Sequence, residues 1–415
     1  MLGENTNWAG NLVYSTERVH APRSLGELQD VVRRAERAHA VGSRHSFTPI
    51  ADTDCEQISL KHLNRILSID SAAQTVTVEG GITYGQLTPE LHRAGFALHN
   101  LASLSTITIA GAAATGTHGS GNNNKSLSAA VRGVKIITAD GEIVAFNRGD
   151  AEFDGVVVSL GALGVVAELT LDIQPDFDVR QDEYIELPFE ALAANFEDIM
   201  GSGYSVSLFH GWAGDTIKKV LAKRVGATGP NEAGLFGARE VLRHPALPAS
   251  LDSEMATEQA RGPRASHLQL PHFSDDAIAV AGNELQAEYF VPRRQAVAAL
   301  RAVQTVERHL EKVLIVGEIR TVAADSMWLS PAFERDCLAI HFTCHRDLPA
   351  LKVALPAIEA ALMPFDPRPH WAKVFTMTGA EVQRCYPKLS EFRALRKKLD
   401  PHSKFGNAFI DEFVG

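Results

Sequence analysis

Residues 102–121, ASLSTITIAGAAATGTHGSG, are almost all small, and this stretch decides which fold the sequence can adopt. Gly, Ala, Ser and Thr let a backbone approach a ligand closely and leave N–H groups that can bind phosphate oxygens. Two more such segments, residues 41–47 (VGSRHSF) and 161–166 (GALGVV), occur in the same half of the chain. Each alone would most simply be a tight turn against a core. Three together favour a site for a nucleotide with a diphosphate.

The two commonest nucleotide-binding signatures are absent. No GxGxxG follows a predicted strand, and no GxxxxGK[ST] occurs anywhere in the chain. The sequence therefore indicates a nucleotide-binding fold that uses neither of these loops.

Local patterns around the small-residue segments predict a mixture of strands and helices. Ser24 with Glu27, and Thr83 with Gln86, are typical starts of a capped helix. Asp140-Gly141 is typical of the turn of a β-hairpin. Strands are predicted at residues 38–41, 75–79, 134–138 and 142–146, and the segment 159–171 begins glycine-rich and ends as an alternating strand.

The middle of the chain has a different pattern, in which strands follow one another with few helices between them. The clearest helix is predicted at 293–313, with Val297, Leu300, Val303 and Leu310 facing inward. This order favours an antiparallel sheet with helices on one face, and an α+β fold overall. Residues 226–275 are rich in Pro and Gly and predict a long loop. The strands are predicted at residues 184–187, 205–209, 219–223, 285–290, 314–322, 337–342 and 372–377.

Composition narrows the class of protein. The 415 residues are 45% hydrophobic and 22% charged, as in ordinary globular proteins. Acidic residues outnumber basic ones by 50 to 40, so no nucleic-acid partner is expected. Four cysteines are too few for a disulfide framework. Without a signal-like start or an apolar run of about 20 residues, the sequence predicts a cytoplasmic protein with no membrane partner.

Polar residues recur two positions apart in three predicted strands, so each pair points to one face of its strand. Burying such groups unpaired would cost several kcal/mol, so we expect them to pair with each other or with a polar ligand. A structural ion pair and a solvated sheet face remain alternatives. The pairs are Gln286 and Glu288, Glu318 and Arg320, and His341 and Thr343.

Seven motifs occur in a fixed order along the chain: NWAGN (7–11), VGSRHSF (41–47), GGITYGQL (80–87), the run at 100–121, SLGALGVV (159–166), RPHWAK (368–373) and KFGNAF (404–409). With these motifs the sequence resembles the vanillyl-alcohol-oxidase-type flavoproteins, and within them the aldonolactone and alditol (xylitol) oxidase branch. This resemblance implies a two-domain α+β fold. An FAD-binding domain would comprise residues 1–178 completed by 378–415, and a substrate-binding domain with an antiparallel sheet and helices would comprise 179–377.

The resemblance also implies how FAD is held. His45 matches the histidine that bonds covalently to the flavin 8α-methyl carbon, and an imidazole nitrogen is a suitable nucleophile for that bond. Arg44 stands where the family usually has Gly, and it could pair with the pyrophosphate. The other residues expected at FAD are Val41, Gly42, Ser43, Arg44, Ser46, Phe47, Ala102, Ser103, Thr108, Gly111, Ala112, Ala113, Ala114, Thr115, Gly116, Thr117, His118, Gly164, Val165, Val166, His370 and Asn407.

The resemblance also implies a substrate pocket. In this branch, a set of polar side chains lines a pocket for polyols, and such a pocket suits a hydroxyl-rich substrate because each hydroxyl needs hydrogen-bond partners. The implied reaction is FAD-dependent oxidation of the terminal primary hydroxyl of alditols such as xylitol and sorbitol to the aldose, with O2 reduced to hydrogen peroxide. Glu318, Arg320, His341 and Lys373 are the expected catalytic groups, and either His341 or Lys373 could take the proton. Substrate contacts are expected from Ser103, Gln286, Glu318, Arg320, His341, Thr343 and Lys373.

Two alternatives stay open. An aldonolactone oxidase or dehydrogenase would share these motifs but act on cyclic substrates, and a carbohydrate-binding flavoprotein would bind without turnover. A metal site is not expected, because His341 and His345 lie at the end of a predicted strand, although their spacing is that of ligands on a helix.

Overall fold

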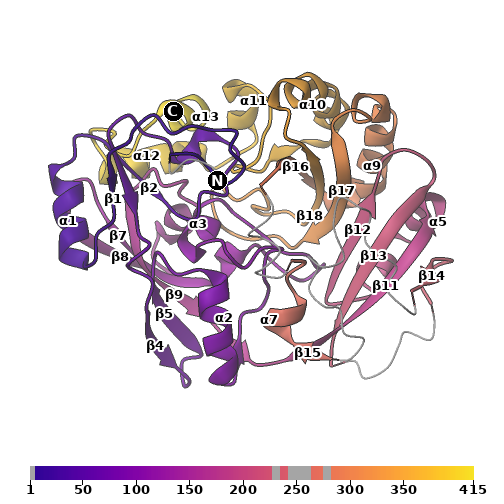
Figure 1. The fold of residues 1–415 in the computed structure, drawn as a ribbon, viewed down its shortest axis with the longest axis horizontal. Helices are drawn as coiled ribbons and strands as arrows, with labels where there is room; N and C mark the ends of the chain where they lie inside the picture. Colours follow the sequence, from indigo (N-terminus) through magenta and orange to yellow (C-terminus); the bar gives the residue numbers. More distant parts are fainter. Residues whose placement is uncertain (1–4, 227–233, 242–262, 274–281) are drawn as a thin grey trace.

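Besides a two-stranded antiparallel pair at Phe96–Ala97 and Gln174–Pro175, the described residues of the first part of the chain form two sheets flanked by helices (Figure 1). The computed structural model describes residues 5–226, 234–241, 263–273 and 282–415. One sheet is parallel, in the order β1-β3-β2, and the other is antiparallel, in the order β4-β5-β9-β7-β8. The elements are β1 (Val19–His20), α1 (Leu25–Arg34), β2 (Ala38–Val41), β3 (Glu56–Ser59), β4 (Ile66–Asp70), β5 (Thr75–Glu79), α2 (Tyr84–Arg93), β6 (Phe96–Ala97), α3 (Ile109–Ala114), β7 (Val131–Ile137), β8 (Ile143–Asn147), α4 (Phe153–Val157), β9 (Val165–Asp172) and β10 (Gln174–Pro175).

The local predictions for this part are confirmed. Ser24 caps α1 by accepting a hydrogen bond from the Glu27 amide, and Thr83 with Gln86 forms a complete capping box at α2. β2 and β5 have the predicted bounds, and β7 and β8 pair as the predicted hairpin.

The second part is a large antiparallel sheet, in the order β14-β11-β13-β12-β17-β18-β16-β19, with β15 pairing to β11. This confirms the predicted antiparallel sheet. In Figure 1, α9 and α10 lie on its outer side, away from α3. The elements are β11 (Asp178–Pro188), α5 (Phe189–Ala194), α6 (Phe196–Met200), β12 (Ser205–His210), β13 (Thr216–Val225), β14 (Arg239–Glu240), β15 (Arg264–Ala265), α7 (Ser266–Gln269), β16 (Glu284–Pro292), α9 (Ala296–Gln304), β17 (Leu314–Val322), β18 (Cys337–His345), α10 (Leu348–Leu362) and β19 (Arg368–Pro369).

Two predictions in this part are wrong. Residues 372–377 are not a strand, because a turn in which Lys373 N bonds to His370 O interrupts their pairing with β16. The helix predicted at 293–313 ends at Gln304, where the Thr305 hydroxyl donates to the Ala302 carbonyl and competes with helical bonding. Short 3₁₀ turns continue the chain, and Leu310 is still buried. Most of the loop predicted at 226–275 lies outside the described residues.

The helix α10 and the turn after it together span 18 residues, Leu348–Phe365, and by length and composition alone this segment could cross a membrane. One face of α10 packs into the core through Leu351, Leu355 and Ile358. Glu359 on this face accepts hydrogen bonds from Tyr289 of β16 and from Thr376. These contacts are those of a helix that covers a sheet.

The last helices return to the first part of the chain (Figure 1). They are α11 (Gly379–Arg384), α12 (Leu389–Leu399) and α13 (Ala408–Phe413). Asn407 caps α13 and donates to the carbonyl oxygens of Ile50 and Asp52, and Ala38 N donates to Lys404 O. Both chain ends thus pack together, as the predicted domain arrangement requires, while its limits at 178 and 378 stay a prediction.

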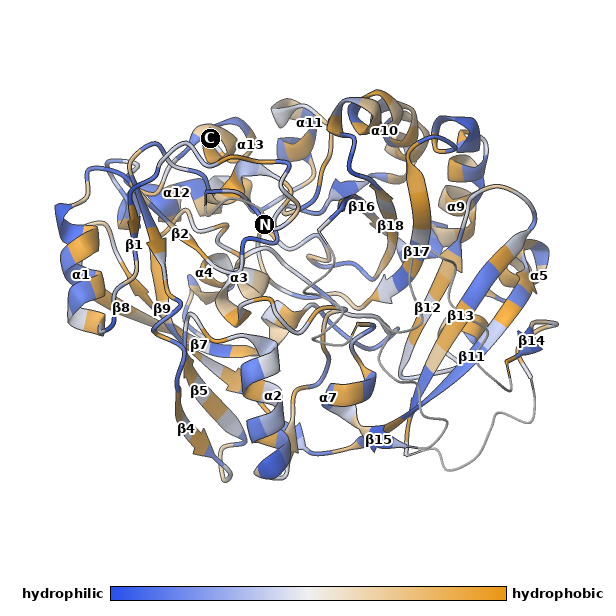
Figure 2. Ribbon diagram, in the orientation of Figure 1, coloured by the Kyte–Doolittle hydropathy of each residue, from blue (hydrophilic) through white to orange (hydrophobic). Residues whose placement is uncertain are grey.

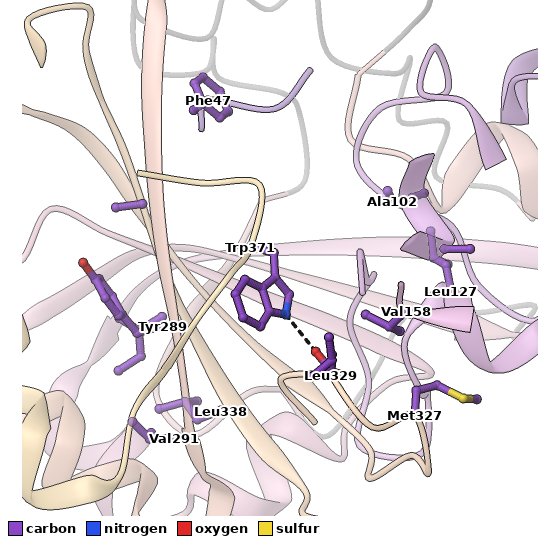
Figure 3. Packing of buried hydrophobic residues seen from close by; sticks show 14 of the residues in the cluster. Phe47, Ala102, Leu127, Val158, Tyr289, Val291, Met327, Leu329, Leu338 and Trp371 are labelled. Carbon is purple, nitrogen blue, oxygen red and sulfur yellow. Dashed lines mark hydrogen bonds between the residues drawn. The ribbon is translucent and has the colours of Figure 1, made fainter. Parts of the chain in front are cut away.

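A continuous apolar core joins the two parts, and Figure 2 shows apolar residues concentrated on the strands and on the inner faces of the helices. Trp371 lies fully buried in this core (Figure 3). Its indole N–H donates to Leu329 O at 2.8 Å, and its ring stacks on Tyr386. The segment that carries His370 and Lys373 is therefore fixed by a large aromatic anchor between them.

Candidate active site

A cavity of about 800 Å³ runs between α3 and the large sheet. This volume is at the upper end of the range for small-molecule and cofactor sites. The three small-residue segments from the first part line one end. The polar side chains of β16, β17 and β18 line the other.

The small-residue wall is closely packed, as the sequence predicts. A Cβ atom on Gly42 would lie 2.2 Å from Thr108 Oγ1, so only glycine fits there. The two segments are also joined by the Thr108 amide, which donates to Ser43 Oγ. His39 faces the same cavity with its Nε2 atom buried and without a hydrogen-bond partner among the described residues. Such an atom in a cofactor-sized cavity indicates a ligand.

His45 lies in this wall, stacked on Trp8 with ring centroids 5.0 Å apart. Its Nδ1 is 3.0 Å from Ser43 O, which can only accept, so Nδ1 carries the proton. Burial lowers the pKa of His45 to about 4, and the ring is therefore neutral at pH 7. Nε2 keeps its lone pair, which is what a nucleophilic imidazole requires.

Arg44 adopts a left-handed backbone conformation, with φ 62°. This explains why glycine is usual at this position in the family that the sequence resembles. The guanidinium lies over the Tyr14 ring, 5.5 Å from its centroid. Stacking on Tyr14 gives Arg44 a fixed place at the cavity edge.

Glu288 is the centre of the polar end, and it is 1% exposed. Arg320 Nη2 donates to its Oε1 at 2.6 Å, and Lys373 Nζ is 3.5 Å from its Oε2. His118 Nε2 and His341 Nδ1 lie 3.2 and 3.6 Å from Oε1. One carboxylate thus holds side chains from β17, β18, the HWAK motif and the THGSG loop in a single cluster.

These charges perturb one another. Burial raises the pKa of Glu288, but Lys373 and Arg320 outweigh burial and hold it well below its usual range. Burial lowers the pKa of Lys373, and Glu288 opposes that shift. Burial also lowers the pKa of His341 to about 4, with Lys373 adding to the effect. At neutral pH the cluster therefore contains an ionised Glu288 and a neutral His341.

Lys373 and His341 are neighbours that can exchange a proton. Lys373 Nζ donates to Gln286 Oε1 at 2.6 Å and lies 3.1 Å from His341 Nδ1. The other ring nitrogen of His341 is 3.1 Å from Thr343 Oγ1. Arg320 Nε is buried and has no hydrogen-bond partner among the described residues, although it lines the cavity. Its nearest charged neighbour is Glu318 Oε2, at 3.7 Å, so Arg320 lies between the Glu288 and Glu318 carboxylates.

The structure brings most of the predicted residues together at one cavity, including all of the expected substrate-contacting and catalytic side chains. Four predicted FAD residues do not line it. Ser128 covers Ala113 and donates a hydrogen bond to its carbonyl oxygen, and Gly116 lies against Pro331. Val165 is buried in a separate hydrophobic cluster beneath α1, and Asn407 caps α13. Their positions support the wall from behind.

Three residues at the polar end were missed. Glu288 shows in the sequence as the partner of Gln286 on one strand face, but its central place among four cationic or basic groups does not. His272 contacts Glu318 at 3.1 Å, and Lys223 contacts His272 at 3.1 Å. His272 lies in a segment without periodicity and Lys223 in an ordinary strand, so no sequence signal marks them.

His118, Glu288 and His370 place possible metal-ligand atoms within 4.8 Å of one another. Arg320 and Lys373 already neutralise Glu288, and a further cation there would meet both positive charges. The geometry is better explained as an ion-pair cluster than as a metal centre.

Comparisons with known proteins agree with this geometry. Residues 16–147 match the model for an FAD binding domain, and residues 281–413 match that for D-arabinono-1,4-lactone oxidase. The chain is 43% identical to an alditol oxidase from Streptomyces sp. over 99% of its length and 98% of that protein.

The chain belongs to the aldonolactone and alditol oxidase branch of the vanillyl-alcohol-oxidase-type flavoproteins. Two further relatives share less of the sequence. They are an L-gulono-1,4-lactone dehydrogenase from Mycobacterium tuberculosis, at 29% identity over 99% of each chain, and a mouse L-gulonolactone oxidase, at 27% over 98% and 97%. A solved cholesterol oxidase from B. sterolicum shares the fold, with a TM-score of 0.80 over 99% of this chain and 96% of that chain at 15% identity. The predicted flavoprotein family and α+β fold are confirmed.

The residues present fit the FAD that this flavoprotein branch binds. The closely packed glycine wall, the orphaned His39 nitrogen and the neutral His45 imidazole all face one cavity. The opposite end supplies charged and hydroxyl-binding groups for a polar substrate.

Proposed function

We propose that the protein oxidises the terminal primary hydroxyl of alditols, xylitol and sorbitol among them, to the aldose. FAD is held by the wall at 41–47, 102–118 and 161–166, and His45 attaches it covalently through its imidazole. Bound FAD supplies the redox chemistry, since it accepts the hydride and passes two electrons to O2, which yields hydrogen peroxide. The protein supplies binding, orientation and charge.

One observation carries the choice of substrate class. Arg320, Lys373, Glu318 and Gln286 present donors and acceptors around one end of the cavity, at residue positions where an apolar substrate would require apolar side chains. A chain of hydroxyls can satisfy such a set, because each hydroxyl both donates and accepts. The 43% identity to an alditol oxidase supports the same class.

The side chains divide the chemistry between them. Arg320 supplies the positive charge of its guanidinium, and Lys373 that of its ammonium, near the oxygen that becomes negative as its proton leaves. Lys373 and His341 share a hydrogen bond, so a proton taken by one can pass to the other. Glu288 keeps both groups in place, and Glu318 accepts a hydrogen bond from the substrate.

A substrate panel tests this proposal. Peroxide release is measured with xylitol and sorbitol, and with gulono- and galactono-lactone as competing substrates. The proposal expects steady peroxide with the polyols and little with the lactones. The opposite result would make the protein an aldonolactone oxidase, and reduction of a dye without peroxide would make it a dehydrogenase.

A further inference from the structure

Lys223 and His272 form a buried pair behind the substrate end of the cavity, and the proposed reaction does not use them. Lys223 lies on β13 and is 1% exposed, which is rare for a lysine. His272 follows α7 and lines the cavity beside Phe209, whose ring meets it edge-on. A buried ammonium group retained in such a place needs a physical reason.

The hydrogen bonds fix the direction of every contact in the pair. Lys223 Nζ lies 2.6 Å from Leu270 O, 3.5 Å from Pro271 O and 3.1 Å from His272 Nδ1. Carbonyl oxygens only accept, so the amine donates to them and to Nδ1. Burial lowers the pKa of Lys223 to about 7. A neutral amine could also accept through its lone pair, but on the other side of the ring His272 Nε2 faces the Glu318 carboxylate, which only accepts, and this leaves Nδ1 as the acceptor for Lys223.

Because Nδ1 accepts, the proton of the neutral His272 ring lies on Nε2. That atom is 3.1 Å from Glu318 Oε1 and 3.3 Å from Ser207 Oγ. Burial lowers the pKa of His272 to about 4, with Lys223 adding to the effect, so the ring is neutral at pH 7. Lys223 on one side of the ring and Glu318 on the other thus both favour the tautomer that donates to Glu318.

Glu318 is held from its other side by Arg320, whose Nε lies 3.7 Å from Oε2. Burial raises the pKa of Glu318, but Arg320 and the His272 hydrogen bond outweigh it and hold the pKa well below its usual range. Without the imidazole, the carboxylate could rotate to bind Arg320 with both oxygens. It would then withdraw from the substrate and occupy the N–H groups of Arg320.

We propose that Lys223 and His272 are positioning residues, which hold Glu318 in one orientation as an acceptor for a substrate hydroxyl and so set the affinity for polyols. The kinetic part of this inference rests on the proposed function. A polar relay that begins at a buried lysine explains why β13 carries Lys223 where an apolar residue would pack.

The reductive half-reaction tests the role. The flavin of the holoenzyme is followed under anaerobic conditions while xylitol is varied, which separates substrate affinity from the limiting rate of reduction. We expect His272→Leu to weaken xylitol binding about 10- to 100-fold, the loss typical of a hydrogen bond to a charged group, with the limiting rate within about threefold. His272→Gln restores an N–H near the Nε2 position and should bind within about threefold of the wild type. Lys223→Met should weaken binding about tenfold, whereas Lys398→Met on the surface should not.

Three results would overturn the inference. They are unchanged affinity in His272→Leu, equal losses in His272→Leu and His272→Gln, and a limiting rate that falls as far as the affinity. The second would assign the effect to the shape of the ring, and the third would make His272 part of the chemistry.

A substrate-free measurement separates this inference from the proposed function. Nitrogen NMR of protein labelled with ¹⁵N-histidine reports the tautomer, and the His272 signals are those missing from His272→Gln. We expect a single Nε2–H tautomer in the wild type and a mixture in Lys223→Met. An Nδ1–H tautomer, or no change in Lys223→Met, would contradict the relay. If xylitol did not reduce the wild-type flavin, the proposed function would fail while the NMR result would still decide the relay.

Discussion

Replacing Glu288 with Gln should affect both stability and turnover. Glu288 is buried between Arg320 at 2.6 Å and Lys373 at 3.5 Å, so the substitution takes the nearest anion from Lys373 and leaves Arg320 with Glu318 alone. Breaking a buried ion pair by removing one partner costs about 3–5 kcal/mol. At roughly 2 °C per kcal/mol for a protein of this size, the melting temperature should fall by about 6–10 °C.

The same substitution should shift the pH dependence. Burial already lowers the pKa of Lys373, and Glu288 is the strongest group that opposes the shift. Removing this anion lowers the pKa of Lys373 further. The kinetic pKa that reports Lys373 should therefore move to lower pH, whichever protonation state turnover requires. Because Arg320 also loses its anchor, kcat/KM for xylitol should fall about 100-fold.

Glu284→Gln is the matched control. Glu284 lies on the same face of β16 and lines the same cavity. Burial raises its pKa, so its surroundings do not favour the ionised carboxylate as those of Glu288 do. We expect its melting temperature to stay within about 2 °C of the wild type, because it leaves no buried pair of cations behind. Calorimetry and pH profiles of both variants check the reasoning. Equal melting temperatures for Glu288→Gln and Glu284→Gln, with the same kinetic pKa as the wild type, would refute the central role of Glu288.

The remaining predictions concern the cofactor wall and Arg320. His45→Ala should release its flavin into the supernatant on acid precipitation, whereas the wild-type pellet should stay yellow; a yellow His45→Ala pellet would refute the attachment. Gly42→Ala places a Cβ 2.2 Å from Thr108 Oγ1 and should cost about 1–3 kcal/mol and reduce FAD content. Gly26→Ala, which meets nothing within 4 Å in helix α1, should instead stabilise by about 0.5–1 kcal/mol, and thermal melts of the two variants decide. Arg320→Lys keeps the charge but loses the planar guanidinium that lies between Glu288 and Glu318, so flavin reduction should slow about 10- to 100-fold while the melting temperature changes little; unchanged reduction would remove Arg320 from the site.

Short-range patterns account for the parts of the fold that the sequence predicts. Capping residues at Ser24 and Thr83, and the turn at Asp140-Gly141, act within a few residues and need no tertiary partner. Residues 372–377 alternate like a strand, but the turn at Lys373 beside the buried Trp371 interrupts the ladder, and among the backbone bonds to β16 after this turn only that of Val374 N to Gln286 O is found in the described residues. Helix α10 escaped prediction because a proline interior to a helix usually breaks it, yet Pro356 lies within α10.

The site shows the same division. Alternation along β16, β17 and β18 predicts which polar side chains share a face, and the family resemblance predicts which of them meet a substrate. Neither reveals Lys223 and His272, because their contacts join a strand to a segment nearly 50 residues further along the chain. Alternation also does not distinguish Glu288 from Gln286. Glu288 is central because four side chains surround its carboxylate, namely Lys373, Arg320, His118 and His341.

Anaerobic titration of the purified wild-type protein with xylitol decides whether an alditol reduces the bound flavin. We expect a yellow protein whose flavin absorption bleaches on addition of xylitol and returns on admission of air, with about one hydrogen peroxide formed per flavin. A flavin that stays oxidised in excess xylitol, sorbitol and other alditols would contradict it.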